Sequence, residues 1–211
     1  MNIRPVLYES NANNRGIDKY GFFLKTIKSL KQKIFLLEKS LTELRHYAHH
    51  DELTGLANRS LLRDRLHQAI NLADRYDKKV GLLLLDLNGF KQINDNYGHH
   101  IGDELLIMVA KRLGSSIRAT DSVFRYGGDE FLILLPEVDG EQGAQELMSK
   151  LLANLSKLYS IEGRDLIITA SIGIALYPAN GATQYALIKY ADKAMYQAKN
   201  HEKMRIKAQL S

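Results

Sequence analysis

The sequence predicts a mixed α/β fold that is preceded by a long N-terminal helix. A short apolar run at 80–85 is typical of a buried central strand, and a Gly127-Gly128 pair separates two further strand-like segments. An apolar heptad repeat between residues 20 and 48 predicts the helix. The chain has 211 residues, which is enough for one domain and a sizeable extension.

The composition is that of a globular protein with a basic N-terminal part. Hydrophobic residues make up 45% and charged residues 25% of the chain, so a buried core is expected. The absence of cysteine excludes disulfides, thiolate metal sites and cysteine nucleophiles, and it fits a reducing compartment. Residues 1–50 hold 9 basic and 4 acidic residues and carry the whole net charge of +5, because residues 51–211 hold 20 of each.

Nucleic acids and membranes are not expected as partners. The sequence shows no basic face interleaved with aromatic residues and no nucleic-acid motif, so the N-terminal lysines are interpreted as a solvated helix face. The apolar runs are far shorter than the ~20 residues of a bilayer span. Residues 1–5 lack the apolar core of a secretion signal. These features predict a soluble, cytoplasmic protein.

The N-terminal part is predicted to contain a flexible lead and a dimerisation helix. Residues 1–18 are polar and rich in asparagine, which is typical of a poorly ordered segment. Residues 19–49 contain no proline, and their apolar residues recur every three or four positions: Tyr20, Phe23, Ile27, Leu30, Ile34, Leu37, Leu41, Leu44 and Ala48. Isoleucine at a and leucine at d favour a parallel two-stranded coiled coil, and hence a homodimer. The alternative is a single amphipathic helix that packs on its own domain.

Residues 50–211 are predicted to form the globular domain. Asn58 is expected to cap a helix over 59–76. Further helices are predicted at 105–117, 141–158 and 186–199, and strands at 80–85, 122–126, 129–135 and 166–176. Gly127 and Gly128 would form a two-residue hairpin turn, since such turns require positive φ angles.

Three acidic residues follow the predicted strand and turn. Asp86 comes directly after the apolar run at 80–85, and Asp129 and Glu130 come directly after the two glycines. If the hairpin lies beside the first strand, these carboxylates converge and repel one another unless a cation lies between them. Mg²⁺ prefers one or two carboxylates together with substrate phosphates. The pattern therefore indicates a metal-assisted nucleotide site.

The segments around these acids resemble the GGDEF-domain diguanylate cyclases. The resemblance extends over about residues 47–207 and is carried, in the family's order, by 51–59 (DELTGLANR), 86–103 (DLNGFKQINDNYGHHIGD), 125–131 (RYGGDEF), 171–173 (SIG) and 191–199 (ADKAMYQAK). It implies a palm-like nucleotidyl-cyclase fold with a mostly antiparallel central sheet flanked by helices. It also implies that two GTP molecules condense to cyclic di-GMP and two pyrophosphates. One such domain binds one GTP, so activity would need a dimer.

The resemblance assigns the three acids to metal binding and catalysis. Asp86, Asp129 and the carbonyl of Leu87 would bind Mg²⁺, with Mn²⁺ as an alternative ion. Glu130 would be a further metal ligand or the proton acceptor for the reacting 3′-hydroxyl. Lys91, grouped with Asp129 and Glu130 as catalytic, would neutralise phosphate charge.

The resemblance also implies a set of substrate-binding residues. Asn94 and Asp103 would recognise guanine, whose N1–H and N2–H₂ groups a carboxylate can accept as a pair. Phosphates would meet Lys199, Lys203 and the backbone near Phe90, and Gly128 would leave room for the ligand's close approach. Ordinary roles stay open: Asn94 as a turn residue, and Lys199 and Lys203 as solvated residues near a helix C-terminus.

Two positions depart from the family pattern. Asn88 stands where a second acid is common, which removes one charge near the metal. Lys203 stands where an arginine is common, and a point charge would hold phosphate less tightly than a guanidinium fork.

An RxxD sequence, Arg118 to Asp121, precedes the glycine pair. The resemblance implies an inhibitory product site there, in which Arg118 holds a phosphate or a guanine edge and Asp121 holds a guanine N–H pair. The alternative is a strand-flanking pair without a ligand. For the whole chain, a catalytically silent cyclic di-GMP receptor and a purely structural dimerisation module remain open.

Overall fold

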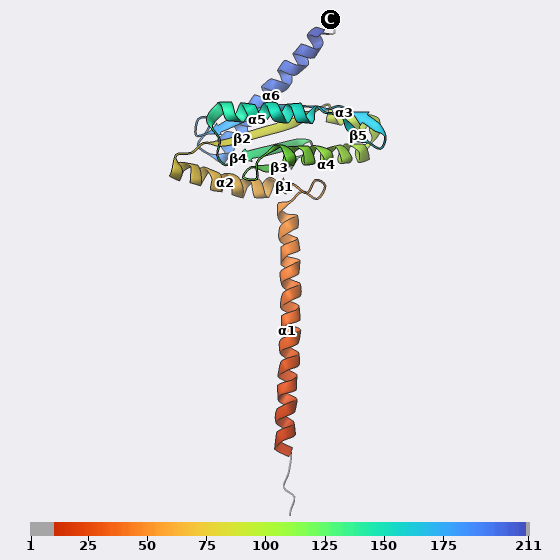
Figure 1. Cartoon of the computed structure of the whole chain (residues 1–211), viewed down its shortest axis with the longest axis vertical. Coiled ribbons are helices and arrows are strands. Elements are labelled where there is room, and N and C mark those ends of the chain that lie inside the picture. Colours follow the sequence, from red (N-terminus) through yellow and green to blue (C-terminus); the bar gives the residue numbers. More distant parts are fainter. Residues whose placement is uncertain (1–10, 210–211) are drawn as a thin grey trace, which may run out of the picture. The chain divides into compact units, whose positions relative to one another are not determined.

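The computed structural model describes the backbone of residues 11–209 and the side chains of residues 21–201 and 204. Two compact units are distinguished, residues 1–46 and residues 47–211. The predicted N-terminal helix is present as α1 (Asn11–His49), which Figure 1 shows as one uninterrupted helix. Within residues 11–209, no helix combines the length and the apolar character that crossing a membrane requires.

Helix α1 begins within the segment that the sequence assigned to a flexible lead. Residues 11–18 contain no proline, and adding a turn to an existing helix costs far less than starting one. The large apolar residues at a and d are exposed along the first unit: Phe23, Ile27, Leu30, Ile34, Leu37, Leu41 and Leu44.

The second unit is built around a five-stranded sheet with the order β1-β3-β4-β2-β7. The strands are β1 (Ala57–Asn58), β2 (Val80–Asn88), β3 (Ser122–Gly127), β4 (Glu130–Leu135) and β7 (Thr169–Tyr177). Only the short β1 pairs in parallel, with β3, and the other pairs are antiparallel. A mostly antiparallel sheet flanked by helices, as predicted, is confirmed.

Helices cover both faces of the sheet (Figure 1). Strand alternation decides which residues meet each helical layer. Helices α2 (Arg59–Tyr76) and α6 (Gln184–Gln209) cover one face, where Leu82 and Leu84 of β2 are buried. Helices α3 (Phe90–Tyr97), α4 (His99–Ser116) and α5 (Gly140–Leu155) lie on the other face, with Leu83 and Leu85. Even-numbered residues of β2 therefore face α6.

Local signals predicted some elements with accurate bounds. Helix α2 covers 59–76 as expected, and the Asn58 Oδ1 accepts from the backbone N–H groups of Ser60 and Leu61 at 2.9 and 3.2 Å. Other bounds were wrong. The strand predicted at 166–176 is divided into β6 (Arg164–Leu166) and β7, and β6 pairs with β5 (Tyr159–Ile161). Strand β5 directly follows the predicted helix 141–158, which in the structure already ends at Leu155.

Candidate active site

The first acid of the site lies inside the central strand rather than at its end. Strand β7 pairs with β2 as far as Asn88, so Asp86 is two residues inside β2 and only 9% exposed. This corrects the predicted position. Asp86 shares the α6-covered face with Leu84, and its carboxylate accepts a hydrogen bond from the Lys199 Nζ of α6 at 2.6 Å.

The turn between β3 and β4 carries the other two acids. Gly127 pairs with Glu130, so the turn residues are Gly128 and Asp129 rather than the two glycines. A register shift between Arg125 and Gly127 is the reason, because a bulge moves the turn one residue along the chain. Gly128 has φ +50°, and a Cβ there would meet no atom within 4 Å. A glycine at this position allows the positive φ angle of the turn and leaves the backbone open to the approach of a ligand.

Strand pairing brings the three acids together, because the hairpin that carries Asp129 and Glu130 lies beside the strand that carries Asp86. Asp86 and Glu130 are direct cross-strand partners, and the Leu87 N–H lies 3.4 Å from the Asp129 carbonyl oxygen. Burial raises the pKa of Asp129 and of Glu130, and repulsion from Asp86 raises the pKa of each further. Asp192 of α6 adds to the repulsion that raises the pKa of Glu130. The carboxylates are therefore close enough to favour a cation between them.

The donor set fits Mg²⁺ that is shared with a substrate. Among the described residues, no group of three or more acidic or histidine side chains forms a complete metal site by itself. Mg²⁺ does not need one, because it commonly takes one or two carboxylates and fills its remaining positions with water and phosphate oxygens. Asp86, Asp129 and the Leu87 carbonyl would supply such a partial shell.

The chain leaves β2 through a glycine into a short helix that the sequence did not reveal. Gly89 has φ +80° and stands at the N-terminus of α3. Phe90 is buried and anchors the first turn of α3, whereas Lys91 is exposed. The exposed Lys91 side chain is thus next to residues 88–90, whose backbone is expected to bind phosphate.

Asn94 of α3 is one of three described residues, with His49 and Tyr159, that hold a buried side-chain polar atom without a hydrogen-bond partner. Its Oδ1 atom is buried and has no hydrogen-bond partner in the described part of the chain. Such orphan acceptors are rare in folded proteins. Helix α4 approaches so closely that a Cβ on Gly102 would lie 1.8 Å from this oxygen. The next residue, Asp103, is exposed on α4, which packs against α3, so the two predicted guanine-binding residues lie on neighbouring helices.

Comparison with known proteins agrees with this geometry. Residues 48–205 match the protein family described as diguanylate cyclase, GGDEF domain. The chain belongs to this family. The second structural unit coincides closely with its GGDEF domain.

Curated relatives of this GGDEF protein include named diguanylate cyclases. A bifunctional diguanylate cyclase/cyclic di-GMP phosphodiesterase, MucR of Pseudomonas aeruginosa, is 49% identical over 164 residues, which cover 78% of this chain and 24% of MucR. The diguanylate cyclase DosC of Escherichia coli is 36% identical over 201 residues, covering 93% of this chain and 43% of DosC. The chain thus spans less than half the length of either relative.

Solved structures show the same fold. The GGDEF domain of TpbB from Pseudomonas aeruginosa has a TM-score of 0.71 at 37% identity and covers 72% of this chain and 90% of that one. The coiled coil and GGDEF domain of DgcB from Caulobacter crescentus, in complex with c-di-GMP, has a TM-score of 0.78 at 26% identity and covers 85% and 95%.

Sequence reasoning missed the residue that holds the turn of this GGDEF domain. Arg125 donates from Nη1 to both carboxylate oxygens of Asp51, at 2.9 and 3.1 Å, and from Nε and Nη2 to the Gly128 carbonyl oxygen, at 3.1 and 2.9 Å. Asp51 also accepts from the N–H and the hydroxyl of Thr54. Arg125 was visible only as a letter of the motif, since its two partners lie 74 and 3 residues away.

The RxxD residues form a compact turn at the other end of β3. The Asp121 N–H donates to the Arg118 carbonyl oxygen at 3.0 Å, and the Arg118 N–H donates to a carboxylate oxygen of Asp121 at 3.1 Å. Both residues line a cavity of about 220 Å³, which also contains Lys150 and Glu146 of α5. The two side chains thus share one concave surface, with a second cation from α5.

One predicted phosphate-binding residue falls outside what the structure describes. Lys203 belongs to α6, but its side chain is not among the described ones. Lys199, one turn earlier on the same helix, is described and pairs with Asp86.

Proposed function

We propose that this chain is an active diguanylate cyclase, which condenses two GTP molecules into cyclic di-GMP and two pyrophosphates. The convergence of Asp86, Asp129 and Glu130 carries the proposal, because the three carboxylates repel one another and no packing requirement explains them. A silent product receptor or a structural module would have no use for this cluster. GTP is an intracellular nucleotide, so the cytoplasm is the expected place of the reaction.

Mg²⁺, or Mn²⁺ in its place, is the proposed cofactor. Asp86, Asp129 and the Leu87 carbonyl would hold the ion, with Glu130 beside them. Such an ion favours ionisation of a hydroxyl nucleophile and offsets charge on the transferring phosphate. Lys199 now neutralises Asp86 and would instead turn to the phosphates of a bound nucleotide.

The protein's own residues have distinct proposed roles in bond formation. Asn94 and Asp103 would hold guanine and thereby orient the ribose. Glu130 would accept the proton of the 3′-hydroxyl while that oxygen attacks the α-phosphorus of the second GTP. The bond from this phosphorus to the bridging oxygen breaks, and pyrophosphate leaves with its charge offset by Lys91 and Lys199. The same step with the nucleotides exchanged closes the ring.

A second copy of the chain is proposed as the partner. One GGDEF domain supplies one nucleotide site, so two must face each other. Exposure of the apolar seam from Phe23 to Leu44 supports pairing through residues 19–49 as a parallel coiled coil. The DgcB structure likewise contains a coiled coil and a GGDEF domain. Such pairing raises the local concentration of the second domain.

Product inhibition at Arg118 and Asp121 is also proposed. The shared cavity beside Lys150 supports it, because guanidinium and ammonium groups suit the phosphates of cyclic di-GMP while the carboxylate suits guanine N–H groups. Replacing Arg118 by alanine should leave initial rates unchanged and abolish the slowing that accumulated product causes.

A turnover assay tests the main proposal. Purified protein is incubated with GTP and Mg²⁺, and pyrophosphate and cyclic di-GMP are measured. The unsubstituted chain should form both, Asp129→Ala should form neither, and the surface control Asp77→Asn should match the unsubstituted chain. Product binding without turnover would support a receptor instead, and neither binding nor turnover would leave only a structural module.

A further inference from the structure

The last two residues of β2 are supported mainly from one side of the sheet. Pairing with β4 ends at Asp86 and Glu130, whereas pairing with β7 continues through Leu87 to Asn88, opposite Thr169. On the β4 side, the backbone link of Leu87 is a long hydrogen bond of 3.4 Å to Asp129. The position of the Leu87 carbonyl therefore depends on how well β7 holds this end of β2.

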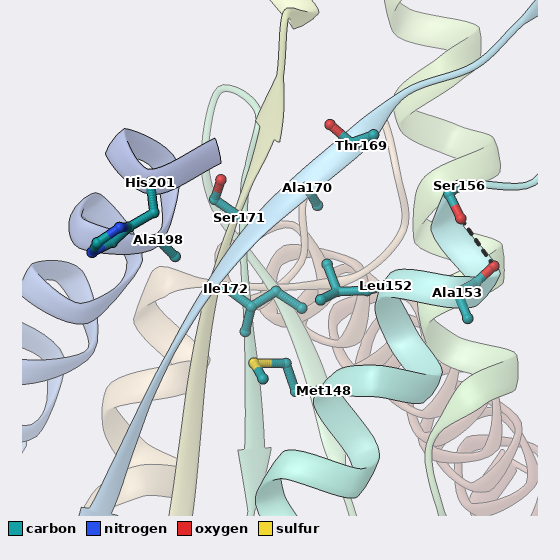
Figure 2. Close-up of a pocket in the computed structure, with 10 residues that line it drawn as sticks. All are labelled: Met148, Leu152, Ala153, Ser156, Thr169, Ala170, Ser171, Ile172, Ala198 and His201. Atoms are coloured by element: carbon teal, nitrogen blue, oxygen red, sulfur yellow. Dashed lines mark hydrogen bonds between the residues drawn. The ribbon is translucent and has the colours of Figure 1, made fainter. Parts of the chain in front are cut away.

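Two hydroxyl groups of β7 hold Asn88 by its side chain. The Asn88 Nδ2 donates to the Thr169 Oγ1 at 3.1 Å, and the Ser171 hydroxyl donates to the Asn88 Oδ1 at 3.0 Å. Figure 2 shows Thr169 and Ser171 pointing to the same side of β7. Ser171 is 3% exposed, so the hydrogen bond that it makes is shielded from water.

The chemistry of this contact explains an amide at position 88. An amide can donate and accept at the same time, so Asn88 can donate to the Thr169 hydroxyl and accept from the Ser171 hydroxyl. Asp86 lies two residues earlier on the same face of β2 and is already engaged with Lys199. A neutral Asn88 thus ties the strand end to β7 without adding a charge beside the carboxylate cluster.

Thr169 and Ser171 also border a cavity of about 570 Å³. Its apolar lining includes Ile172 of β7 and Met148 and Leu152 of α5, which Figure 2 shows on the opposite side of β7 from the Thr169 and Ser171 hydroxyls. The Thr169 side chain is exposed, so a methyl group in place of its hydroxyl would meet solvent. Removing these hydroxyls should leave the fold intact and isolate the effect of the lost hydrogen bonds.

We propose that Asn88, Thr169 and Ser171 form a polar clamp that positions the Leu87 carbonyl and the backbone of residues 88–90 for the metal-bound triphosphate. The three are positioning residues, since they act through the backbone that meets the ligand. This inference rests on the proposed function, because the clamp matters only if that backbone binds a nucleotide.

The test combines hydrogen exchange with nucleotide binding. The double variant Thr169→Val/Ser171→Ala is compared with the unsubstituted chain, with Thr169→Ser as a rescue variant that keeps a hydroxyl. Ser160→Ala is the matched control, since it removes a serine hydroxyl that donates to Asp165 in the β5–β6 hairpin. Amide exchange of residues 87–90 is measured without ligand. Affinity is then measured for a GTP analogue with a non-hydrolysable α–β bridge in the presence of Mg²⁺.

In the double variant, exchange at residues 87–90 should accelerate by about fivefold to thirtyfold, which corresponds to one or two lost hydrogen bonds. Analogue affinity should fall by a comparable factor, while the rescue and control variants stay near the unsubstituted chain. Unchanged exchange, or faster exchange with unchanged affinity, would overturn the clamp alone. No analogue binding by the unsubstituted chain would overturn the proposed function and, with it, the role of the clamp toward a nucleotide.

Discussion

Replacement of Arg125 by alanine should both destabilise the GGDEF domain and disable its glycine turn. The side chain is 15% exposed and joins two segments, because it pairs with Asp51 and also donates twice to the Gly128 carbonyl oxygen. Alanine would leave a partly buried carboxylate without its cation and a turn carbonyl without its donors. Asp129, the next residue along the turn, would lose its fixed position.

The loss of folding free energy in Arg125→Ala lies between two limits. Breaking a fully buried ion pair from one side costs about 3–5 kcal/mol, whereas an exposed pair is worth about 0–1 kcal/mol. The Asp51 side chain is 24% exposed and keeps both hydrogen bonds from Thr54, so water and Thr54 compensate in part. We therefore expect a loss of about 2–3 kcal/mol for Arg125→Ala. Arg125→Lys should lose about half of that, since it restores the charge but not the fork.

The pH dependence gives a second, independent sign of the same contact. Burial alone would raise the pKa of Asp51, but hydrogen bonds from Thr54 and Arg125 outweigh it and lower the pKa below its ordinary value of 3.8. A carboxyl group with a lowered pKa in the folded state adds stability above its unfolded pKa, and this stability is lost as the pH falls through the folded value. As the pH falls below about 4, the free energy of unfolding of Arg125→Ala should therefore decrease less than that of the unsubstituted chain.

Urea denaturation between pH 3 and pH 7 measures both effects, and pyrophosphate release measures the turn. The unsubstituted chain and Arg125→Ala should differ most at neutral pH and converge in acid. A difference below about 0.5 kcal/mol at pH 7, with normal turnover, would show that Arg125 neither stabilises the fold nor positions the turn.

Three further outcomes are expected. Burial and repulsion raise the pKa of Asp129, so its contribution to metal-free stability is present below about pH 4 and is lost as the pH rises through the raised value. Asp129→Asn should remove this pH dependence in thermal unfolding. At neutral pH, Mg²⁺ should stabilise only the unsubstituted chain. Gly102→Ala places a Cβ 1.8 Å from the Asn94 Oδ1 and should weaken binding of the GTP analogue at least tenfold in calorimetry. Leu30→Asp should halve the mass in analytical ultracentrifugation, whereas Leu36→Asp, which is equally exposed but off the a and d positions, should not.

Elements with a local cause could be predicted from the sequence. The apolar run at 80–85 requires burial on both faces, and the structure buries it between two helical layers. The cap at Asn58 acts on the next three residues, so the start of α2 was predicted correctly. The heptad repeat predicted a helix because its period is a property of the segment itself.

Elements with a distant cause could not be predicted in this way. The end of β2 depends on pairing with β7, more than 80 residues away, so Asp86 was wrongly placed at the strand end. Helix α3 carries mostly polar residues and has one buried residue, Phe90, which gives no apolar period. The turn bounds depend on a bulge at Arg125 and Gly127 that only the pairing register reveals.

The candidate site shows the same division between chemistry and geometry. The sequence identified Asp86, Asp129 and Glu130 as metal-binding candidates, because one acid follows an apolar strand, two follow the glycine pair, and the family resemblance assigns all three to the metal site. It could not show that Lys199 neutralises Asp86 in the chain alone, or that Asn88 is tied to β7. Side chains such as these act on neighbours that are distant in sequence.

Three features of the chain are costly when it stands alone, and each matches a component of the proposed reaction. The repulsion among Asp86, Asp129 and Glu130 would be relieved by a divalent cation. The orphan oxygen of Asn94 would be satisfied by a guanine N–H group. The exposed seam of α1 would be buried by a second copy. A module selected only for stability or pairing would retain the third feature but not the first two, and this is the strongest structural reason to expect turnover rather than dimerisation alone.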